Sequence, residues 1–338
     1  MPPQQTQVNV ALLGFGNVGR AFASYVEALG ALPIRINVRA IADSSGGLLL
    51  DENSVLGQVI AHKESGSFLS DFGASTSILG IDEFVRALPS AGISVLVESL
   101  PTNITSGQPA LGLITAALAQ GTNVVTVDKG PLVHGLNSLK DAQVRGATRL
   151  GFSGTTGVSI PEELATDRVL EIRGVLNGTT NYILSEMQQN HRSFDEALIA
   201  AQAEGIAEPD PSLDVDGWDT VSKVLILANA LMGANARLAE VSRTGIGLQT
   251  ESLIRIAHES GRVVRLVGRA RMWQGRVRVS VAPKLVRLDS PFYSVSGTSK
   301  AAVFRTERQG EVLALGRSGR DAISQTIVDD IARFASEL

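Results

Sequence analysis

The residues best suited to chemistry lie close together between positions 207 and 223. This stretch holds five carboxylates and one lysine, and the residues after it, 224–232, are almost wholly apolar. Asp219 and Lys223 are four residues apart, so on a helix both side chains lie on one face. Charged groups gathered at the edge of a core have perturbed proton affinities. The pattern therefore predicts a polar pocket in which Lys223 exchanges a proton with a substrate oxygen.

The ordinary interpretation of Asp219 and Lys223 is an exposed ion pair on a helix surface. Their position argues for burial instead, because the residues around them form an apolar stripe, and Ile226 and Leu227 extend it to other faces. Burial and a neighbouring carboxylate act in opposite directions on the proton affinity of a lysine. We therefore expect a partly desolvated pair. The stripe comprises Val221, Val224, Leu225, Ala228 and Leu231.

Three glycines near the N-terminus predict a binding site for a dinucleotide. Gly14, Gly16 and Gly19 stand between a β-branched apolar run, residues 8–13, and a helical pattern at 21–29. The first permits a tight turn, the second lets a pyrophosphate approach the backbone, and the third lets helix and strand pack closely. The helix N-terminus adds free N–H groups and a favourable dipole. The alternative is a simple glycine-rich turn, but the strand–turn–helix order favours the cofactor.

Other residues near these glycines are candidates for cofactor contacts. Asn17 and Val18 lie between the second and third glycines. Asp43 ends the second predicted strand, where an acidic residue is expected to meet the adenosine ribose; it could instead stabilise the turn that follows. Arg20 and Arg39 are near in sequence and could hold a 2′-phosphate. The choice between NAD and NADP therefore stays open.

Two later strands also end in polar residues. Residues 93–97 and 123–127 are short apolar runs, and the loops after them contain Thr102 and Lys129. Because the carboxyl ends of parallel strands face the ligand crevice, both residues are predicted to line it. A solvated loop lysine is the alternative interpretation of Lys129.

A further polar segment, residues 177–182, follows the apolar run 169–176 and opens a helix at 182–188. Its small hydrogen-bond donors suit the carboxylate of a ligand at a helix N-terminus. A helix cap by Thr179 or Thr180 is the alternative, and the two roles can coexist.

Composition excludes several classes of function. The 338 residues carry a formal charge of −4, with no basic run of the kind that binds nucleic acid. No apolar stretch is long enough to cross a membrane, and the first residues do not resemble a secretory signal. The chain has no cysteine and four scattered histidines, which argues against thiolate chemistry and against Cys or His metal sites. We expect a cytoplasmic protein without a metal, a nucleic-acid partner or a membrane partner.

The order of apolar patterns predicts the fold class. Up to about residue 150, strand-like runs such as 34–41 alternate with helical ones such as 109–119. This alternation predicts an α/β fold with a doubly wound, Rossmann-type parallel sheet. Later segments, 262–271 and 275–286, alternate apolar and basic residues, as in an antiparallel sheet with one solvated face. The length suits two domains, and residues 321–338 have the spacing of an amphipathic helix.

These motifs together resemble those of the homoserine dehydrogenase family, over nearly the whole chain. The resemblance implies reversible hydride transfer between the nicotinamide of NADP or NAD and C4 of a small amino acid. The reaction would interconvert L-homoserine and L-aspartate 4-semialdehyde, in the biosynthesis of threonine and methionine. The similar segments are residues 176–184 (Leu-Asn-Gly-Thr-Thr-Asn-Tyr-Ile-Leu), 207–211 (Ala-Glu-Pro-Asp-Pro) with Asp214, Gly217, Asp219 and Lys223, and 316–322 (Gly-Arg-Ser-Gly-Arg-Asp-Ala).

The resemblance implies catalytic roles for three residues. Lys223 would be the proton donor or acceptor for the C4 oxygen of the substrate, and Asp219 would orient or polarise that oxygen. Lys129, in a segment similar to the family's Thr-Ala-Asn-Lys, would line the reacting centre.

It also implies binding roles. Glu208 and Asp214 would hold the substrate ammonium, while Gly178 and Thr179 would contact its carboxylate end. Gly319 belongs to the late glycine loop, which would return to the dinucleotide. No role is assigned to Asp210 or Asp216.

The chain departs from the family pattern in places. Many members carry a glutamate ahead of Val-Gly-Gly-Gly-Ile-Pro, where a sodium ion binds, but residues 152–161 contain none, which places that ion in doubt. Asp128 replaces the usual asparagine before Lys129. No regulatory domain follows the final helix, so feedback by threonine through such a domain is not expected.

We assign residues 1–150 and 316–338 to a dinucleotide-binding domain, and 151–315 to an α+β domain for substrate binding and homodimer formation. Two alternatives remain. Another amino-acid dehydrogenase could use the same fold, because a fold does not determine its substrate. A dinucleotide-binding regulatory protein without turnover would have no need of an acid/base lysine at Lys223. Oxidation of an aldehyde through a thioester is disfavoured, since there is no cysteine.

Overall fold

The computed structural model describes residues 6–29, 34–50, 56–72, 78–316 and 319–336. Contacts divide the chain into two units: residues 1–155 with 319–338, and residues 156–318. We call these the first and the second unit. The division falls at 155/156 and 318/319, where the sequence suggested 150/151 and 315/316.

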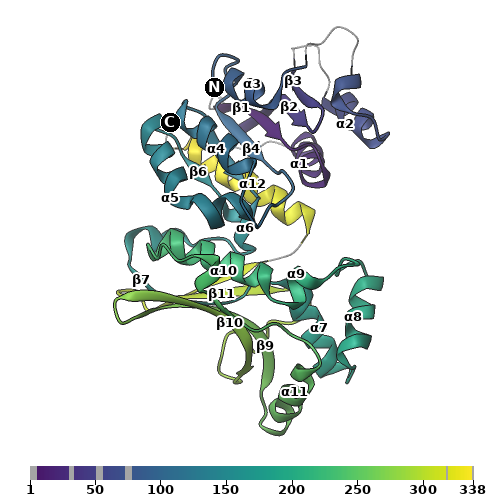
Figure 1. Cartoon of the computed structure of the whole chain (residues 1–338), viewed down its shortest axis with the longest axis vertical. Coiled ribbons are helices and arrows are strands. Elements are labelled where there is room, and N and C mark those ends of the chain that lie inside the picture. The colour runs from purple at the N-terminus through teal and green to yellow at the C-terminus, as the bar shows by residue number, and fades with distance from the viewer. Residues whose placement is uncertain (1–5, 30–33, 51–55, 73–77, 317–318, 337–338) are drawn as a thin grey trace, which may run out of the picture. The chain divides into compact units, whose positions relative to one another are not determined.

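The first unit is built on a six-stranded sheet in the order β3-β2-β1-β4-β5-β6 (Figure 1). The strands from β2 to β6 pair in parallel, and β3 pairs antiparallel with β2 at the edge. The glycines and serines after Asp43 predicted a turn in the β3 region, not a strand. The strands are β1 Thr6–Leu13, β2 Ile34–Asp43, β3 Gly46–Leu49, β4 Val95–Glu98, β5 Asn123–Thr126 and β6 Leu150–Gly151.

Helices cover this sheet. The C-terminal helix α12, yellow in Figure 1, returns to the first unit and packs against α1, and α4 packs against α5. Apolar side chains of α1 and α12, including Phe22, Ile327 and Ile331, join those of β1 and β2 in one core. The helices are α1 Asn17–Ala28, α2 Leu56–Glu64, α3 Ile81–Ala87, α4 Ala110–Ala119, α5 Lys129–Gly146, α6 Ser153–Thr156 and α12 Arg320–Ala335.

The second unit is built on a sheet in the order β12-β11-β7-β9-β10-β8. All neighbours pair antiparallel except β8 with β10. Helix α10 packs on β7, β9 and β10 and covers one face. The strands are β7 Val169–Val175, β8 Ser242–Arg243, β9 Val263–Trp273, β10 Arg276–Val286, β11 Lys300–Thr306 and β12 Glu311–Gly316; the helices are α7 Gly178–Gln189, α8 Phe194–Ala203, α9 Ser212–Val215, α10 Trp218–Leu231 and α11 Gln249–Glu259.

Two predicted helices begin earlier than their apolar patterns suggested. Helix α1 starts at Asn17 instead of residue 21, and α7 starts at Gly178 instead of Tyr182. In both helices the first turn consists mostly of small or polar residues, which give too few apolar positions for a periodicity to be detected. Both helix N-termini therefore lie closer to the ends of the preceding strands than the apolar patterns predicted.

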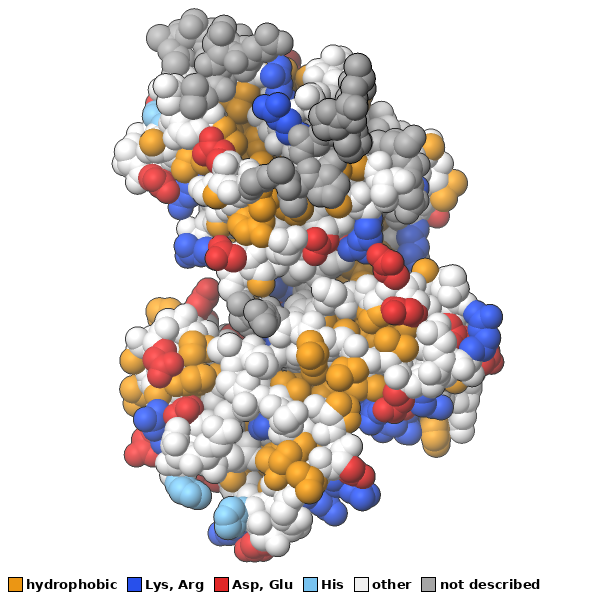
Figure 2. Space-filling view, turned by 180° about the vertical axis from the view of Figure 1, so that it is seen from behind, with side chains coloured by type: hydrophobic (Ala, Val, Ile, Leu, Met, Phe, Trp, Pro, Cys, Tyr) orange, Lys and Arg blue, Asp and Glu red, His pale blue; other side chains and the backbone are white. Residues whose placement is uncertain are grey.

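On the face shown in Figure 2, acidic and basic side chains are interspersed, in line with the small net charge. Within the described part of the chain, no helix is both long and apolar enough to cross a bilayer.

Candidate active site and cofactor site

The strongest candidate for chemistry is an ion pair near the start of α10. The Nζ of Lys223 lies 2.6 Å from Oδ2 of Asp219 and donates a hydrogen bond of 2.8 Å to the backbone oxygen of Leu176. The two charged side chains are 10% and 14% exposed, far less than a surface pair would be. Apolar residues of α10 pack on the sheet and carry Lys223 into this environment because it lies on the same helix. An ammonium group has three N–H donors, so a ligand oxygen could accept from Lys223.

Asn177 connects two carboxylates of the site. It lies just after β7, and its Nδ2 donates to Oδ1 of Asp214 at 2.5 Å and to Oδ2 of Asp219 at 2.8 Å. Asp219 therefore receives hydrogen bonds from both Lys223 and Asn177 on one oxygen. The result is a connected polar cluster: Lys223, Asp219, Asn177 and Asp214.

The surroundings of Asp214 favour its neutral form. Burial raises the pKa of this carboxyl, and the negative charge of Asp219 adds to the effect. Hydrogen bonds from Thr179 and Asn177 and the charge of Lys223 act in the opposite direction without cancelling it. A substrate ammonium near Asp214 would favour the charged carboxylate.

Asn177 also begins helix α7. Its Oδ1 accepts from the backbone N–H of Thr180 at 2.7 Å and from the Thr180 hydroxyl at 2.9 Å, so Asn177 is the N-cap. The expectation that Thr179 or Thr180 caps the helix is wrong. Asparagine is among the best N-cap residues because its side-chain oxygen reaches the free N–H groups of the first turn. This preference was the signal in the sequence that could have identified Asn177.

Replacing Asn177 by alanine is expected to lower both stability and turnover. The change removes the helix cap, worth about 1 kcal/mol, and leaves Asp214 and Asp219 without the amide donor between them. The thermal midpoint and the steady-state rate measure the two effects. Asn190→Ala is the matched control, because Asn190 is an exposed asparagine at the other end of the same helix, and its side chain bonds to Glu186 on that helix. Wild-type values for both Asn177→Ala measurements would contradict the role of the bridge.

The other predicted substrate residues differ in position. Gly178 and Thr179 are buried in the first turn of α7, where the Thr179 hydroxyl donates to the backbone oxygen of Ile206 at 3.2 Å. Glu208 is exposed, and no hydrogen bond of its carboxylate to the Asn177 cluster is found among the described residues. Asp210 and Asp216 are exposed as well. Of the two acids predicted to hold an ammonium, the structure brings only Asp214 into the cluster.

The three glycines of the first unit occupy the places that a dinucleotide fold needs. Gly14 has a φ of +100°, and a Cβ there would lie 2.6 Å from the oxygen of Ser99. A Cβ on Gly19 would lie 2.2 Å from the oxygen of Gly14, whereas at Gly16 nothing lies within 4 Å. Gly16 and Asn17 are exposed at the start of α1, and Val18 is half-buried. The helix N-terminus is therefore open to an approaching pyrophosphate.

Asp43 makes the turn contacts that were its alternative interpretation. Its Oδ1 accepts from the N–H and the hydroxyl of Ser45, and its Oδ2 pairs with Lys63 at 2.6 Å. Burial acts to raise the pKa of Asp43, but hydrogen bonds from Lys63, Ser45 and Leu69 outweigh it and lower the pKa. Lys63, which no sequence motif indicated, thus places a cation at the end of β2.

The remaining predicted residues, Thr102 and Gly319 for the cofactor and Lys129 for the reacting centre, lie in loops or at the start of a helix. Thr102 is exposed in the loop after β4, and Lys129 is the half-buried first residue of α5, which Asp128 caps. Gly319 is exposed, with a φ of +121°, immediately before α12. The late glycine loop also includes residues 317–318, which lie outside the described residues. The described residues hold no group of three or more His, Asp or Glu side chains suited to a metal ion.

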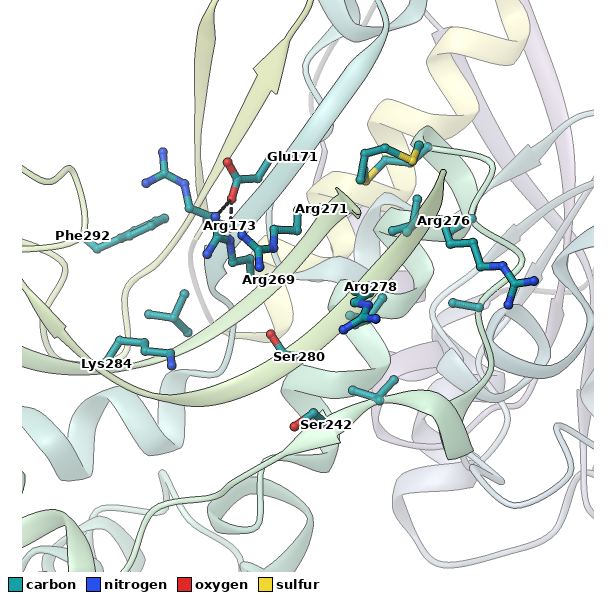
Figure 3. Close-up of a pocket in the computed structure, with 18 of the residues that line it drawn as sticks. Glu171, Arg173, Ser242, Arg269, Arg271, Arg276, Arg278, Ser280, Lys284 and Phe292 are labelled. Carbon is teal, nitrogen blue, oxygen red and sulfur yellow. Dashed lines mark hydrogen bonds and ion pairs between the residues drawn. The ribbon is translucent and has the colours of Figure 1, made fainter. Parts of the chain in front are cut away.

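The second unit carries an open, basic sheet face opposite α10. Figure 3 shows side chains of β7, β9 and β10 there, including Arg173, Arg271 and Arg278. Glu171 pairs with Arg269 at 2.5 Å and with Arg305 at 3.3 Å. Register explains the clustering, because Glu171 lies opposite Arg271 and Arg173 lies opposite Arg269.

Comparison with known protein families gives two matches that together span most of the chain. Residues 14–152 match the model of the homoserine dehydrogenase NAD-binding domain, and residues 158–332 match the model of homoserine dehydrogenase.

Individual relatives agree with these matches. A homoserine dehydrogenase of Methanocaldococcus jannaschii is 31% identical over 96% of this chain and 97% of its own. An NAD(+)-dependent homoserine dehydrogenase of Pseudomonas canavaninivorans is 30% identical over 96% of both chains. A solved structure of a hyperthermophilic archaeal homoserine dehydrogenase in complex with NADPH has a TM-score of 0.75 and 28% identity, over 96% of this chain and 97% of that one. The predicted α/β fold with a Rossmann-type domain and a second domain is confirmed.

Proposed function

Because the chain belongs to the homoserine dehydrogenase family, we propose that the buried pair of Lys223 and Asp219 carries its acid/base chemistry. The protein is an NAD(P)-dependent oxidoreductase that interconverts L-homoserine and L-aspartate 4-semialdehyde, a reaction of amino-acid biosynthesis. Membership of this family decides against the non-catalytic regulatory protein considered above. The observation that carries the proposal is the nearly buried Lys223, held by Asp219 and by Leu176.

In the proposed mechanism, Lys223 donates a proton to the C4 oxygen of the aldehyde, or accepts it from the alcohol in the reverse direction. Asp219 fixes the ammonium group and compensates its charge, so the proton is held at a defined position. When bound, the nicotinamide accepts or supplies the hydride. Lys129 would stabilise charge near the reacting centre.

The substrate's polar ends would be held by the start of α7 and by Asp214. The first turn of α7, with Gly178 and Thr179, offers backbone N–H groups and the helix dipole to the substrate carboxylate. Asp214 would bind the ammonium group, supported by its hydrogen bond from Asn177. Glu208 is a second candidate for binding the ammonium group, supported only by the resemblance of its segment to the family.

The dinucleotide would bind in the first unit, which we propose as the cofactor domain, with the second unit for substrate and dimerisation. The residues present fit this cofactor: Gly16 leaves the N-terminus of α1 open, and Gly14 and Gly19 are packed too closely for a side chain. Asn17, Val18, Thr102 and Gly319 would add contacts. NAD and NADP are both candidate cofactors. Asp43, the acidic residue expected at the ribose, is already paired with Lys63, and Arg20, which could hold a 2′-phosphate, lies beside this pair.

A spectrophotometric assay tests the function. Homoserine-dependent reduction of NAD and NADP is measured on the purified protein, with other small amino-acid alcohols as competing substrates. Preference for homoserine is the expected result. A higher kcat/KM for another amino acid would indicate a different amino-acid dehydrogenase on this fold. Absence of turnover with either cofactor would contradict the proposal. We also propose a cytoplasmic location, where this cofactor and substrate are available. Cell fractionation tests it.

We also propose a homodimer that forms through the basic sheet face. This face is open in one chain, and the exposed Asp289 lies among its arginines, so a twofold axis would bring opposite charges of two copies together. Arg278→Glu is expected to shift the protein from dimer to monomer in light scattering coupled to gel filtration. Arg145→Glu on the exposed end of α5 is the control and should stay dimeric. A monomeric wild type, or a dimeric Arg278→Glu, would contradict this interface.

A further inference from the structure

Glu98, the last residue of β4, is a fully buried carboxyl that the proposed reaction does not use. Its side chain is 0% exposed. Its Oε1 accepts a hydrogen bond of 2.7 Å from the N–H of Leu100, and its Oε2 lies 2.5 Å from the hydroxyl of Thr126. A buried carboxyl normally has a cationic partner or is protonated, and no salt bridge to Glu98 occurs in the described part of the chain.

A second buried carboxyl, Asp128, lies on the other side of Thr126. The N–H of Asp128 donates to the Thr126 hydroxyl at 3.0 Å, and Oδ1 of Asp128 accepts from the N–H of Gly130 at 2.9 Å. Its Oδ2 is buried and has no hydrogen-bond partner among the described residues. Thr126 thus connects the carboxyl of Glu98 with the backbone of Asp128, and two neighbouring negative charges at this depth would repel each other.

Few other ionisable groups surround this pair. The described strands β1 and β5, the glycine loop 14–19 and the loop 99–109 contain none. Lys129 follows Asp128 on α5. On α12, which packs against β5, the buried Asp330 is paired with Arg333. Of these charged groups, Asp128 is the one that adds to burial in raising the pKa of Glu98.

The network joins three loops at the carboxyl edge of the sheet. Between Glu98 and Leu100, Ser99 donates from its N–H to Leu13 and from its hydroxyl to Gly14, both at 2.8 Å. This fixes the glycine loop to the loop after β4. On the other side, Asp128 caps α5, the helix that begins with Lys129. All three loops carry residues that the proposed function assigns to the cofactor or the reacting centre.

We propose that Glu98 is a positioning residue: in its protonated form it holds these three loops in the arrangement that receives the dinucleotide, and on ionising it loosens them. In the protonated form, Oε2–H donates to the Thr126 hydroxyl oxygen while Oε1 still accepts from Leu100. After ionisation the Thr126 hydroxyl donates to Glu98 instead, and a second charge faces Asp128. The inference rests on the proposed cofactor site. The roles of Glu98, Thr126 and Asp128 are additional to that proposal.

The electrostatics give the pH range. Burial and the charge of Asp128 raise the pKa of Glu98 to about 8, against opposing hydrogen bonds from Thr126 and Leu100. The folded protein therefore keeps a proton on Glu98 at pH values above 4.5, the ordinary pKa of this carboxyl, where the unfolded chain releases it. Stability from this group is complete below that value and is lost as the pH rises toward 8.

The test compares wild type with Glu98→Gln, Glu98→Ala, Asp128→Asn and the exposed control Glu83→Gln on α3. Dissociation constants for NADPH and NADH are measured by fluorescence titration from pH 6.5 to 9.5, without substrate. For wild type the dissociation constant should rise above pH 8, by up to about tenfold per pH unit if the ionised form does not bind. Glutamine reproduces the donor and acceptor of the protonated carboxyl, so Glu98→Gln should bind tightly and lack this rise.

The other variants complete the test. Glu98→Ala should bind weakly at every pH, Asp128→Asn should move the rise to lower pH, and Glu83→Gln should follow wild type. The same profile in wild type and Glu98→Gln, or equal affinity of the Gln and Ala variants, would overturn the proposal. Thermal midpoints separate it from the cofactor assignment: the wild-type midpoint relative to Glu98→Gln should fall between pH 5 and 8 even without a dinucleotide. Absence of that fall would overturn the network, whereas failure of wild type to bind either dinucleotide at pH 6.5 would overturn the cofactor site.

Discussion

Replacing Lys223 by alanine is expected to lower kcat for homoserine oxidation by roughly 10²–10⁴-fold, the usual contribution of a positioned general acid or base. The physical reason is that Asp219 and the oxygen of Leu176 hold the ammonium of Lys223 at a defined position, and alanine leaves no proton donor or acceptor there. KM for homoserine should change less than kcat, because the proton moves in the transition state.

Two further variants sharpen this prediction. Lys223→Arg keeps the positive charge but cannot release its proton, so it should be nearly as slow as Lys223→Ala. Lys140→Ala, on the exposed side of α5, removes a lysine elsewhere and should keep wild-type kcat. Near-normal kcat in Lys223→Ala would show that the catalytic role is wrong, although the family assignment would stand.

Stability must be measured alongside these rates. Removing Lys223 leaves Asp219 largely buried without its cation, which costs free energy of folding unless the carboxyl becomes protonated. A circular-dichroism spectrum at the assay temperature, together with the thermal midpoint of unfolding, shows whether the slow variants are folded. The double variant Asp219→Asn with Lys223→Met removes both charges and should recover stability without recovering turnover.

The second large effect is expected at the glycines of the first unit, where two neighbouring positions should respond differently to the same change. A Cβ on Gly19 would lie 2.2 Å from the backbone oxygen of Gly14. Because this obstacle is backbone, Gly19→Ala must move α1 away from β1, and overpacking of this kind costs about 1–3 kcal/mol or more. Both the thermal midpoint and the affinity for the dinucleotide should fall.

Gly16→Val should affect binding more than stability. Nothing lies within 4 Å of a Cβ at Gly16, and the residue is exposed at the N-terminus of α1. The added side chain would occupy the space that a pyrophosphate needs, so the dissociation constant should rise strongly. Because valine is a poorer N-cap than glycine, the thermal midpoint of the free protein should fall as well, but less than in Gly19→Ala. Equal midpoints for the two glycine variants, or tight binding by Gly16→Val, would contradict the assignment of this loop.

The amino-acid sequence alone was enough to predict the fold class and the family, because both depend on short-range patterns. The strand–glycine–helix order around residues 8–29 has a local cause in turn geometry and helix packing. The spacing of Asp219 and Lys223 is also local, since residues four apart on a helix face the same way. The matches to the two homoserine dehydrogenase family models confirm that these patterns were assigned to the correct family.

The membership of each polar cluster depended on contacts between distant segments. Asn177 meets Asp214 and Asp219 across 37 and 42 residues, and Asp43 meets Lys63 across 20. No periodicity in the sequence encodes such pairs. The same holds for Glu98, which approaches Thr126 only because β4 and β5 are neighbours in register.

The carboxylates between residues 207 and 223 illustrate the difference between what the sequence determines locally and what the tertiary structure decides. Their sequence determined that one face of a buried helix would carry an acid and a lysine into the second unit, because helical periodicity and apolar neighbours require it. Only the tertiary structure decided which acids join that pair: Asp214 is drawn in by Asn177, whereas Glu208, Asp210 and Asp216 remain exposed. The physical reason is that a carboxylate enters a core only where a donor from another segment offsets its loss of solvation, and the position of that donor is a property of the fold.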